Sequence, residues 1–311
     1  MLEIKATGAQ TSLQDAGRPG HRHLGIPRGG AADKLNFALA NWMAGNAWDA
    51  PALECTLGGL HVKFHRTATI AIAGAEMNAH LRGRPLKNFS YAEVRAGDEL
   101  VFKASTKGCR AYMAMQGGLS GTSFLGSVAT YPLAKLGGLD GTLLSPGDKI
   151  KYANAASQAP RSLPAGFAPV LSEHVVLRVR PSPEVEFLTD VSKRELFIRP
   201  FTATRATDRM GTRLDGIKIE CLAVDNFVSS PILPGTLQIP PDKRPILALV
   251  DGHCTGGYPR AVQVIRADLW LLGQIAPGTK MSFHRCFTED APEILSHRNA
   301  LYGNLIEGFS F

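Results

Sequence analysis

Short apolar runs, each bounded by glycine, proline or polar turn residues, are the dominant pattern along the chain. Residues 246–250 (ILALV) and 261–265 (AVQVI) are continuous apolar runs of the length of buried β-strands. Residues 67–73, 109–115 and 175–180 are also strand-like. The pattern therefore predicts a mainly β fold with a few short helices.

Three segments share one local design, in which a turn containing glycine leads into an alternating strand. They are residues 96–102 (AGDELVF), 146–152 (PGDKIKY) and 277–283 (PGTKMSF). The alternation predicts six inward-facing side chains, which are Leu100, Phe102, Ile150, Tyr152, Met281 and Phe283. Because such units commonly close β-barrels, their spacing along the chain predicts two barrels of related design.

A segment without this periodicity separates the two halves. Residues 151–169 are rich in Ala, Ser and Pro, which is typical of a linker. We therefore predict an N-terminal domain at residues 1–160 and a C-terminal domain at residues 161–311, with an extra tail at about 286–311. We expect the tail to dock through its apolar side chains, which are Ile294, Leu301, Leu305 and Ile306. Contact with a partner protein is the alternative.

Helical periodicity is confined to a few places. Residues 33–44 carry apolar side chains at i, i+3, i+4, i+7 and i+8, with Asp33 as the N-cap and Gly45 as the stop. A second helix is predicted to begin at residues 182–184, where Ser, Pro and Glu favour a helix N-terminus. A third is predicted at residues 267–274.

Composition narrows the class of protein. The 311 residues carry a net charge of +7, but the basic residues are scattered, so we do not expect nucleic-acid binding. Small anionic substrates such as carboxylates or phosphates, or an acidic partner subunit, fit this charge better. The 5 cysteines are far apart and include no C-x-x-C pair, which favours a reducing compartment. No signal peptide or apolar span is evident, so we expect a cytoplasmic protein that does not enter the membrane.

Two polar loops are candidates for substrate binding. In residues 14–23, Arg18 and Arg22 could bind a carboxylate or phosphate through their planar forks of donors, with Asp15 nearby; a structural ion pair between Asp15 and Arg18 is the alternative. In residues 207–213, Asp208 could orient Arg209 toward an anion, and Arg213 lies four residues further on; a capped turn is the alternative.

A third loop, residues 251–259 (DGHCTGGYP), lies between the two apolar runs described first. Asp251 and His253 could form a proton-transfer pair, and Cys254 could be a nucleophile. The glycines of Thr255-Gly256-Gly257-Tyr258 allow a close backbone approach or a positive φ angle. A tight β-turn with a polar tip is the alternative.

Several signatures are absent from the sequence. It has no G-x-x-x-x-G-K-[ST] phosphate loop and no G-x-G-x-x-G, so a nucleotide would need an unconventional site or a partner's site. It has no M-K-M tripeptide of the kind that carries biotin. His21 with His23, and His61 with His65, are expected to be solvated histidines, and we predict no bound metal.

The ordered set of motifs resembles one family. LQDAGRPGHRHLGIPRGGAAD, ALECTLGGLHVKF, RAYMAMQGGLSGTSFLGSVAT, TDRMGTRL, PGTLQIPPDKRPI and TGGYP follow one another as in the KipA family. That family is also called allophanate hydrolase subunit 2, the C component of 5-oxoprolinase, or the C-terminal half of the biotin-dependent urea carboxyltransferase domain. The resemblance covers roughly residues 2–285.

The resemblance implies two cyclophilin-like β-barrel domains and an enzyme subunit that works with a KipI-type partner, similar to the B component of 5-oxoprolinase. The leading expectation is an ATP-dependent 5-oxoprolinase that converts 5-oxoproline to glutamate, with a LamB/YcsF-type protein as a possible further subunit. One alternative is the carboxyltransferase subunit of a biotin-dependent urea or amide carboxylase of the allophanate pathway, with carboxybiotin supplied in trans. Another is a regulatory subunit that acts on a histidine kinase through the KipI-like partner.

The resemblance also ranks the candidate residues. Asp251 and Arg209 become the candidate catalytic residues, and the candidate substrate-binding residues are Asp15, Arg18, Arg22, Arg213, Thr255, Gly256, Gly257 and Tyr258. Family members usually carry Gln and Thr where this chain has His253 and Cys254, which argues against a shared role for either residue. Val128 stands where they have Arg, and Ser230-Pro231 stand where they have Glu-Gly. These departures could alter the substrate or the activity.

Overall fold

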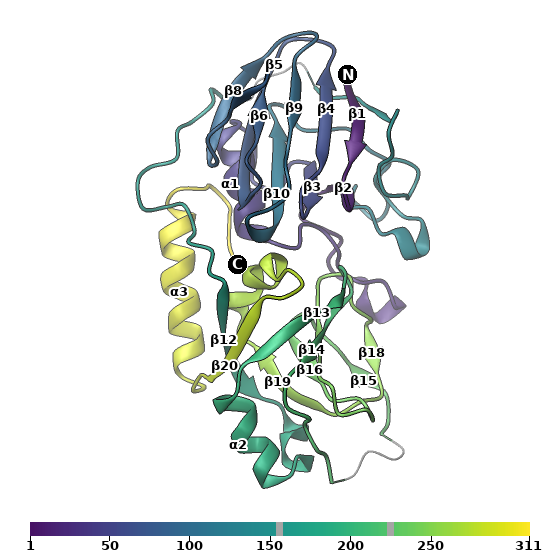
Figure 1. Ribbon diagram of the computed structural model, residues 1–311, viewed down its shortest axis with the longest axis vertical. Helices are drawn as coiled ribbons and strands as arrows, with labels where there is room; N and C mark the ends of the chain where they lie inside the picture. Colours follow the sequence, from purple (N-terminus) through teal and green to yellow (C-terminus); the bar gives the residue numbers. More distant parts are fainter. Residues whose placement is uncertain (154–157, 223–226) are drawn as a thin grey trace. The chain divides into compact units, whose positions relative to one another are not determined.

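The computed structural model describes residues 1–153, 158–222 and 227–311, and its chain divides into two compact units (Figure 1). Unit 1 comprises Met1–Arg18, Gly29–Leu171 and Asn299–Ser310; unit 2 comprises Pro19–Arg28, Ser172–Arg298 and Phe311. Part of the expected linker, residues 154–157, lies outside the described residues. The division into domains at residue 160 stays a prediction.

Unit 1 contains two antiparallel sheets. One has six strands in the order β11 (Lys149–Ile150), β1 (Leu2–Thr7), β4 (Leu60–Phe64), β9 (Glu99–Val101), β6 (His80–Leu81) and β7 (Arg84–Pro85). The other has five strands in the order β2 (Gln10–Gln14), β3 (Ala52–Thr56), β10 (Lys107–Met115), β5 (Ala68–Glu76) and β8 (Ser90–Val94). Apolar side chains from both sheets form one hydrophobic core.

Unit 2 is built around a closed barrel. Its strands follow the order β12 (His174–Pro181), β19 (Arg260–Val264), β16 (Thr236–Gln238), β17 (Ile246–Ala248), β14 (Gly211–Asp215), β13 (Phe201–Thr207) and β20 (Lys280–Arg285). The parallel pairing of β12 with β20 closes the ring, and the other pairs are antiparallel. A separate two-stranded ribbon joins β15 (Ser230–Pro231) to β18 (Thr255–Gly256).

The mainly β prediction is confirmed, and the alternation correctly identified inward-facing positions. All six side chains predicted to face inward are buried, namely Leu100, Phe102, Ile150, Tyr152, Met281 and Phe283. Hydrogen bonding closes a ring of strands in unit 2, whereas the described strands of unit 1 form two sheets. The repeated turn-plus-strand design therefore marks core strands in both units without fixing how each sheet closes.

Helix α1 (Lys34–Met43) confirms the first helix prediction. The Asp33 carboxylate accepts a hydrogen bond from the Asn36 amide at 3.0 Å, and Gly45 takes a φ of 79° just after the helix. The helix packs on β5 and β10, and its residues from Leu35 to Met43 are buried. Covering this face of the sheet completes the core of unit 1.

The other helix predictions need correction. The helix expected to begin at residues 182–184 is a 3₁₀ turn, η3 (Pro183–Phe187); α2 (Asp190–Ile198) follows with Thr189 as its cap. The helix expected at 267–274 is also 3₁₀, η4 (Arg266–Gln274). Two short 3₁₀ turns, η1 (Arg22–Leu24) and η2 (Pro132–Ala134), lie in loops. Capping residues thus marked helical turns but not their type.

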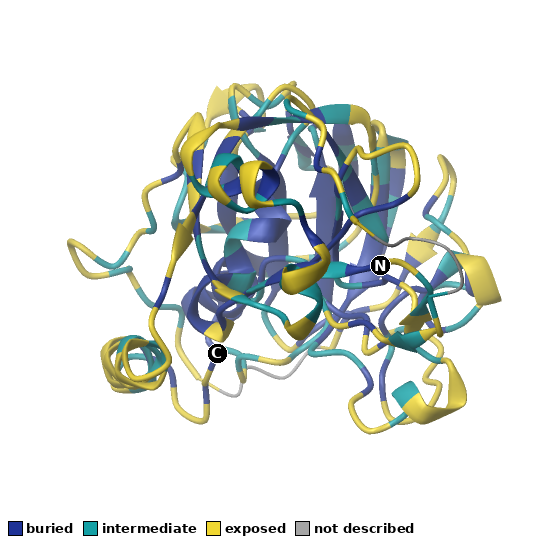
Figure 2. Cartoon of the chain, turned by 90° about the horizontal axis from the view of Figure 1, so that it is seen from below, coloured by how far each residue is buried: buried dark blue, intermediate teal, exposed yellow. Residues whose placement is uncertain are grey.

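The C-terminal tail forms helix α3 (Asp290–Gly303) and a short turn after it. Ile294 packs with Ile265 and Cys286 in unit 2, and Ile306 is buried in unit 1. Leu301 is 50% exposed, so the expectation that it docks is wrong. Figure 2 shows that much of α3 is exposed. None of the helices in the described ranges has the length and apolar character needed to cross a membrane.

We predict that the carboxyl group of Glu3 titrates far below its ordinary value. Hydrogen bonds from Lys5 at 2.8 Å and His65 at 2.7 Å lower the pKa of Glu3 from 4.5 to about 2. Because its pKa is lowered by folding, Glu3 stabilises the native state above pH 4.5, and this contribution is lost as the pH falls toward 2. Carbon NMR of the side-chain carboxyl should give this midpoint, and Lys5→Ala should raise it. A wild-type midpoint near 4.5 would contradict the prediction.

Candidate functional site

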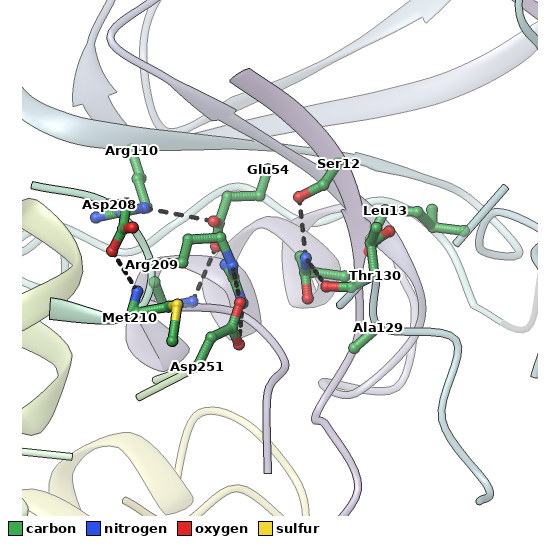
Figure 3. A network of polar contacts seen from close by, with 12 residues as sticks. Ser12, Leu13, Glu54, Arg110, Ala129, Thr130, Asp208, Arg209, Met210 and Asp251 are labelled. Carbon is green, nitrogen blue, oxygen red and sulfur yellow. Dashed lines mark hydrogen bonds and ion pairs between the residues drawn. The ribbon is translucent and has the colours of Figure 1, made fainter. Parts of the chain in front are cut away.

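The central feature of the candidate site is a buried ion pair between Arg209 and Asp251 (Figure 3). Arg209 donates from Nε to Asp251 Oδ2 at 2.7 Å and from Nη2 to Oδ1 at 3.1 Å. The two side chains are 3% exposed each. A bidentate pair of this kind holds the guanidinium plane in one orientation.

Strand register brings these two residues together. Arg209 lies in the turn between β13 and β14, and Asp251 follows β17. Antiparallel pairing of β14 with β17 sets Gly211 opposite Ala248, so the residues before β14 run beside the residues after β17. The Asp251 amide donates to the Arg209 carbonyl at 2.9 Å, which continues this alignment.

Asp208 has a different contact from the one first expected. Its carboxylate accepts hydrogen bonds from the amides of Met210 at 2.7 Å and Gly211 at 3.0 Å, which is the capped turn foreseen as the alternative. Arg209 is bound by the carboxylate of Asp251. Asp208 therefore shapes the turn, and Asp251 orients the arginine.

The 251–259 loop is held by the β15–β18 ribbon. Ser230 pairs with Gly256 and Pro231 with Thr255, so two positions at which the chain departs from the KipA pattern lie beside the TGGY segment. Tyr258 is 40% exposed. The Oγ of Ser230 is buried and has no hydrogen-bond partner within the described ranges. The loop thus exposes the Tyr258 ring, whereas the Ser230 hydroxyl on the paired strand is buried.

The two glycines of this loop have different roles. Neither takes a positive φ angle, so of the two possibilities raised for these glycines only the close backbone approach remains. A Cβ on Gly256 would lie 2.3 Å from Ile232 Cδ1 and 2.8 Å from Gln238 Nε2. A Cβ on Gly257 would meet only ordinary contacts, at 3.4 Å from the Phe227 oxygen. Gly256 is needed for close packing, whereas Gly257 is not.

Gly256→Ala is therefore expected to displace the ribbon and lower the stability of unit 2. The neighbours are side-chain ends that can move, so the cost should be about 1–3 kcal/mol, the range for overpacking. Denaturant unfolding measures it. Gly257→Ala is the matched control and should change stability by less than about 0.5 kcal/mol. Equal effects of the two substitutions would contradict this account of the packing.

His253 and Cys254 do not form a catalytic pair with Asp251 in this loop. His253 is exposed, whereas Cys254 is 8% exposed and its carbonyl accepts from the Ile232 amide at 3.0 Å. Asp251 is bound to Arg209. The proton-transfer and nucleophile hypotheses for these two residues therefore gain no support.

Asp15 and Arg18 hold a loop of unit 1. The Asp15 carboxylate accepts from Ser127 Oγ and from the Val128 amide, both at 2.6 Å. Arg18 is 1% exposed and donates to the carbonyls of Ala129 and Phe124. Both residues thus organise residues 124–129, which contain the departure at Val128.

Arg22 and Arg213 also contact groups of the protein. Arg22, in η1, donates to the carbonyls of Ile232 and His253 and so ties its loop to the 251–259 loop within unit 2. Arg213, on β14, forms a half-exposed ion pair with Asp242. Arg22 therefore contacts the 251–259 loop, whereas the ion pair of Arg213 lies at the surface.

A second buried polar cluster, in unit 1, was not anticipated. Glu54 on β3 and Arg110 on β10 are 1% exposed each, and the distance from Arg110 Nε to Glu54 Oε1 is 3.4 Å (Figure 3). Glu54 Oε2 also accepts from Tyr112 Oη and from the Ala32 amide, both at 2.8 Å. Charged residues inside the otherwise apolar runs 52–56 and 109–115 were the signal that could have revealed this cluster.

The structure gives no candidate metal centre. Among the residues it describes, no group of three or more His, Cys, Asp or Glu side chains could hold a metal ion. His61 and His65 each contact a carboxylate, Glu99 at 2.9 Å and Glu3 at 2.7 Å. Burial raises the pKa of the Cys55 thiol to about 11, so this cysteine is a poor nucleophile.

Comparison with known proteins decides the family. The model of the carboxyltransferase domain, subdomains A and B, matches residues 24–285. The chain belongs to this carboxyltransferase family. It is 34% identical to the C subunit of 5-oxoprolinase from Escherichia coli over 291 residues, which cover 94% of this chain and 93% of that protein.

Larger members of the carboxyltransferase family contain the same fold. The crystal structure of the K. lactis urea amidolyase superposes on 99% of this chain with a TM-score of 0.93 and 28% identity. This chain covers only 20% of that amidolyase chain. The urea amidolyase of Lachancea kluyveri is 30% identical over 99% of this chain, which is 18% of that protein. The family thus includes both 5-oxoprolinase subunits and parts of urea amidolyases.

Proposed function

We propose that this carboxyltransferase-family chain is the C subunit of an ATP-dependent 5-oxoprolinase that works with a KipI-type partner, with a LamB/YcsF-type protein as the candidate further subunit. The observation that carries this proposal is the match to the C subunit of the Escherichia coli 5-oxoprolinase along 93% of that protein. A basic chain with buried arginines also suits a substrate that carries a carboxylate.

In this proposal, Arg209 supplies fixed positive charge at the site. Opening the 5-oxoproline ring builds negative charge on the amide oxygen, and a preorganised guanidinium stabilises such charge without having to reorient. Asp251 keeps the guanidinium plane in place through two hydrogen bonds. In the same proposal, the substrate contacts the backbone amides of Gly256 and Gly257 and the ring of Tyr258.

ATP would supply the activation of the amide oxygen, and we place its binding on a partner subunit. The glycine-containing loop before α1 is a poor phosphate cradle, because the Asp33 carboxylate already accepts a hydrogen bond from the Asn36 amide at that helix N-terminus. A phosphate there would meet a negative charge in the place where helix dipoles favour anions. This chain's own residues therefore bind and orient the small substrate.

The second candidate is transfer of a carboxyl group from carboxybiotin to urea or a related amide. It is favoured by the TM-score of 0.93 against the K. lactis urea amidolyase and by the family model itself. Because the chain has no M-K-M tripeptide, carboxybiotin would come from a partner in trans. The same Arg209–Asp251 pair would then orient the urea or amide acceptor.

One reconstitution separates the two candidates. The chain is co-purified with the partners encoded beside its gene, and glutamate release from 5-oxoproline is measured with and without ATP. ATP-dependent release supports the oxoprolinase. A folded, complete complex that releases no glutamate, but carboxylates urea when given a biotin carboxylase and carrier, would replace the first proposal with the second.

A further inference from the structure

A pocket of about 580 Å³ lies in unit 2, away from the Arg209–Asp251 pair, which does not contribute to its lining. Its walls come from the segment after β15, from β19, from η4 and from the start of α3. Leu233, Leu269, Pro292 and Leu295 are among the apolar side chains that face it. The volume is within the range of about 300–1,000 Å³ that is usual for small-molecule sites. Leu233 is 51% exposed, so an apolar ligand would cover it.

The charged groups of this pocket all have one sign. Its lining includes four arginines, Arg22, Arg28, Arg180 and Arg266, and contains no carboxylate among the described residues. Arg28 and Arg266 are exposed as whole residues, although the guanidinium of Arg28 is partly desolvated. Desolvation and then the charge of Arg266 lower the pKa of Arg28, as expected where two guanidinium groups lie close together. An anion bound beside Arg266 would be attracted by the positive charges that line the pocket.

The remaining polar group of the pocket is already engaged. Gln263 donates from Nε2 to the Pro234 carbonyl at 2.8 Å, and its Oε1 accepts from Thr236 Oγ1 at 2.6 Å. No aromatic side chain lines the pocket within the described ranges. A nucleobase would therefore find neither a stacking ring nor an unengaged amide to read its edge. The walls suit a flexible aliphatic body better.

The position of α3 supports a formed site. The first turns of this helix pack through Ala291, Ile294 and Leu295 against the small core of Ile265, Ala267 and Cys286. Arg180 is held by a hydrogen bond to Thr288 Oγ1 at 2.8 Å, just before the helix. The helix wall and one arginine are thus fixed by contacts inside unit 2.

We propose that this arginine pocket binds an organic anion with an aliphatic body, such as an alkyl carboxylate, whose charged group lies at Arg266 and whose chain lies against Leu269 and Leu295. Two separable interactions contribute to the binding free energy. One is the attraction between the ligand's charge and the arginine, and the other is the burial of its aliphatic chain. Neither interaction uses the Arg209–Asp251 pair. Arg22 lines the pocket and also contacts the 251–259 loop, so binding is measured directly and not through turnover.

Calorimetric titration of the full chain with octanoate tests the proposal. Octanoate should bind saturably at one site, whereas acetate, which lacks the chain, and octan-1-ol, which lacks the charge, should bind at least about tenfold more weakly. Octyl phosphate distinguishes carboxylate from phosphate headgroups. Preferential binding of ATP over octanoate, or equal binding of octan-1-ol, would overturn the assignment.

Two pairs of variants locate the site. Arg266→Gln should weaken octanoate binding about tenfold, or about 1.4 kcal/mol, and Arg194→Gln, an exposed arginine on α2, should leave it unchanged. Ala291→Trp should fill the pocket and abolish binding, while Leu301→Trp, at an exposed position of the same helix, should not. Unaltered binding in both Arg266→Gln and Ala291→Trp would refute the proposal.

Discussion

Removing either charge of the Arg209–Asp251 pair is expected to lower turnover strongly and to destabilise unit 2. Arg209→Met leaves a buried carboxylate without its bidentate partner, and Asp251→Leu leaves a buried guanidinium without its carboxylate. Loss of one partner of a buried pair costs about 3–5 kcal/mol, so each single variant should unfold at much lower denaturant concentration. Catalytic efficiency in the assembled complex should fall by about 10²–10³, the usual effect of losing one preorganised charge-stabilising group.

The double variant Arg209→Met/Asp251→Leu separates stability from function. Replacing both charges removes the unpaired one, so the double variant should be more stable than the sum of the single effects predicts, by about 1–3 kcal/mol. Its activity should stay as low as that of Arg209→Met, because the guanidinium is gone. Recovery of turnover together with stability would show that the pair is only structural.

A matched surface pair provides the control. Lys243 and Glu220 form an exposed ion pair at 2.7 Å in the same unit. Lys243→Gln should change neither the unfolding midpoint nor the turnover, because exposed pairs are screened by water and salt. A loss of turnover in this variant would mean that the assay responds to general surface charge and not to the buried pair.

Local patterns in the sequence predicted elements that depend on near neighbours. The alternation in residues 277–283 identified Met281 and Phe283 as core residues, and Asp33 was recognised as a cap because its acceptor lies three residues from the amide that it binds. Both features are fixed by backbone periodicity and by the composition of one short segment. Helix type was less predictable, since in a segment as short as η4 the periods of 3.0 and 3.6 residues are hard to tell apart.

Pairing across distant segments could not be predicted in the same way. Asp208 was the natural orienter of Arg209 from its position in the chain, but the register of β14 against β17 places Asp251 there instead, 42 residues away. Register depends on which strands are neighbours in the barrel, and one sequence does not specify this. Asp251 was still a candidate, but because it matches the family pattern and not because its pairing with Arg209 was foreseen.

Glu54 illustrates a signal that was present but not used. A carboxylate in the apolar run 52–56 is costly to bury unless it is paired, so its presence predicts a buried partner. Arg110, in the equally apolar run 109–115, is that partner. The β3–β10 pairing sets Tyr112 opposite Glu54 and Arg110 opposite Thr56, which brings the three polar side chains to one place.

Replacement of Glu54 is expected to be the most destabilising polar substitution in unit 1. Glu54→Leu removes the acceptor of Tyr112 Oη and of the Ala32 amide and leaves the Arg110 guanidinium buried without this carboxylate. The expected loss in the free energy of unfolding is about 3–5 kcal/mol. Tyr112→Phe removes only the hydroxyl and should cost about 1–3 kcal/mol, which denaturant unfolding can resolve.

The same cluster gives an alkaline signature that a packing defect would not produce. Burial, and then the charges of Glu54 and Asp33, raise the pKa of Tyr112 well above its ordinary value of 10. Above that pH the unfolded chain ionises this tyrosine while the folded chain keeps the proton, so the wild type loses stability as the pH rises. Tyr112→Phe should lose less stability than the wild type between pH 9 and about pH 11. Parallel pH profiles for the two proteins would mean that Tyr112 is not held protonated by this cluster.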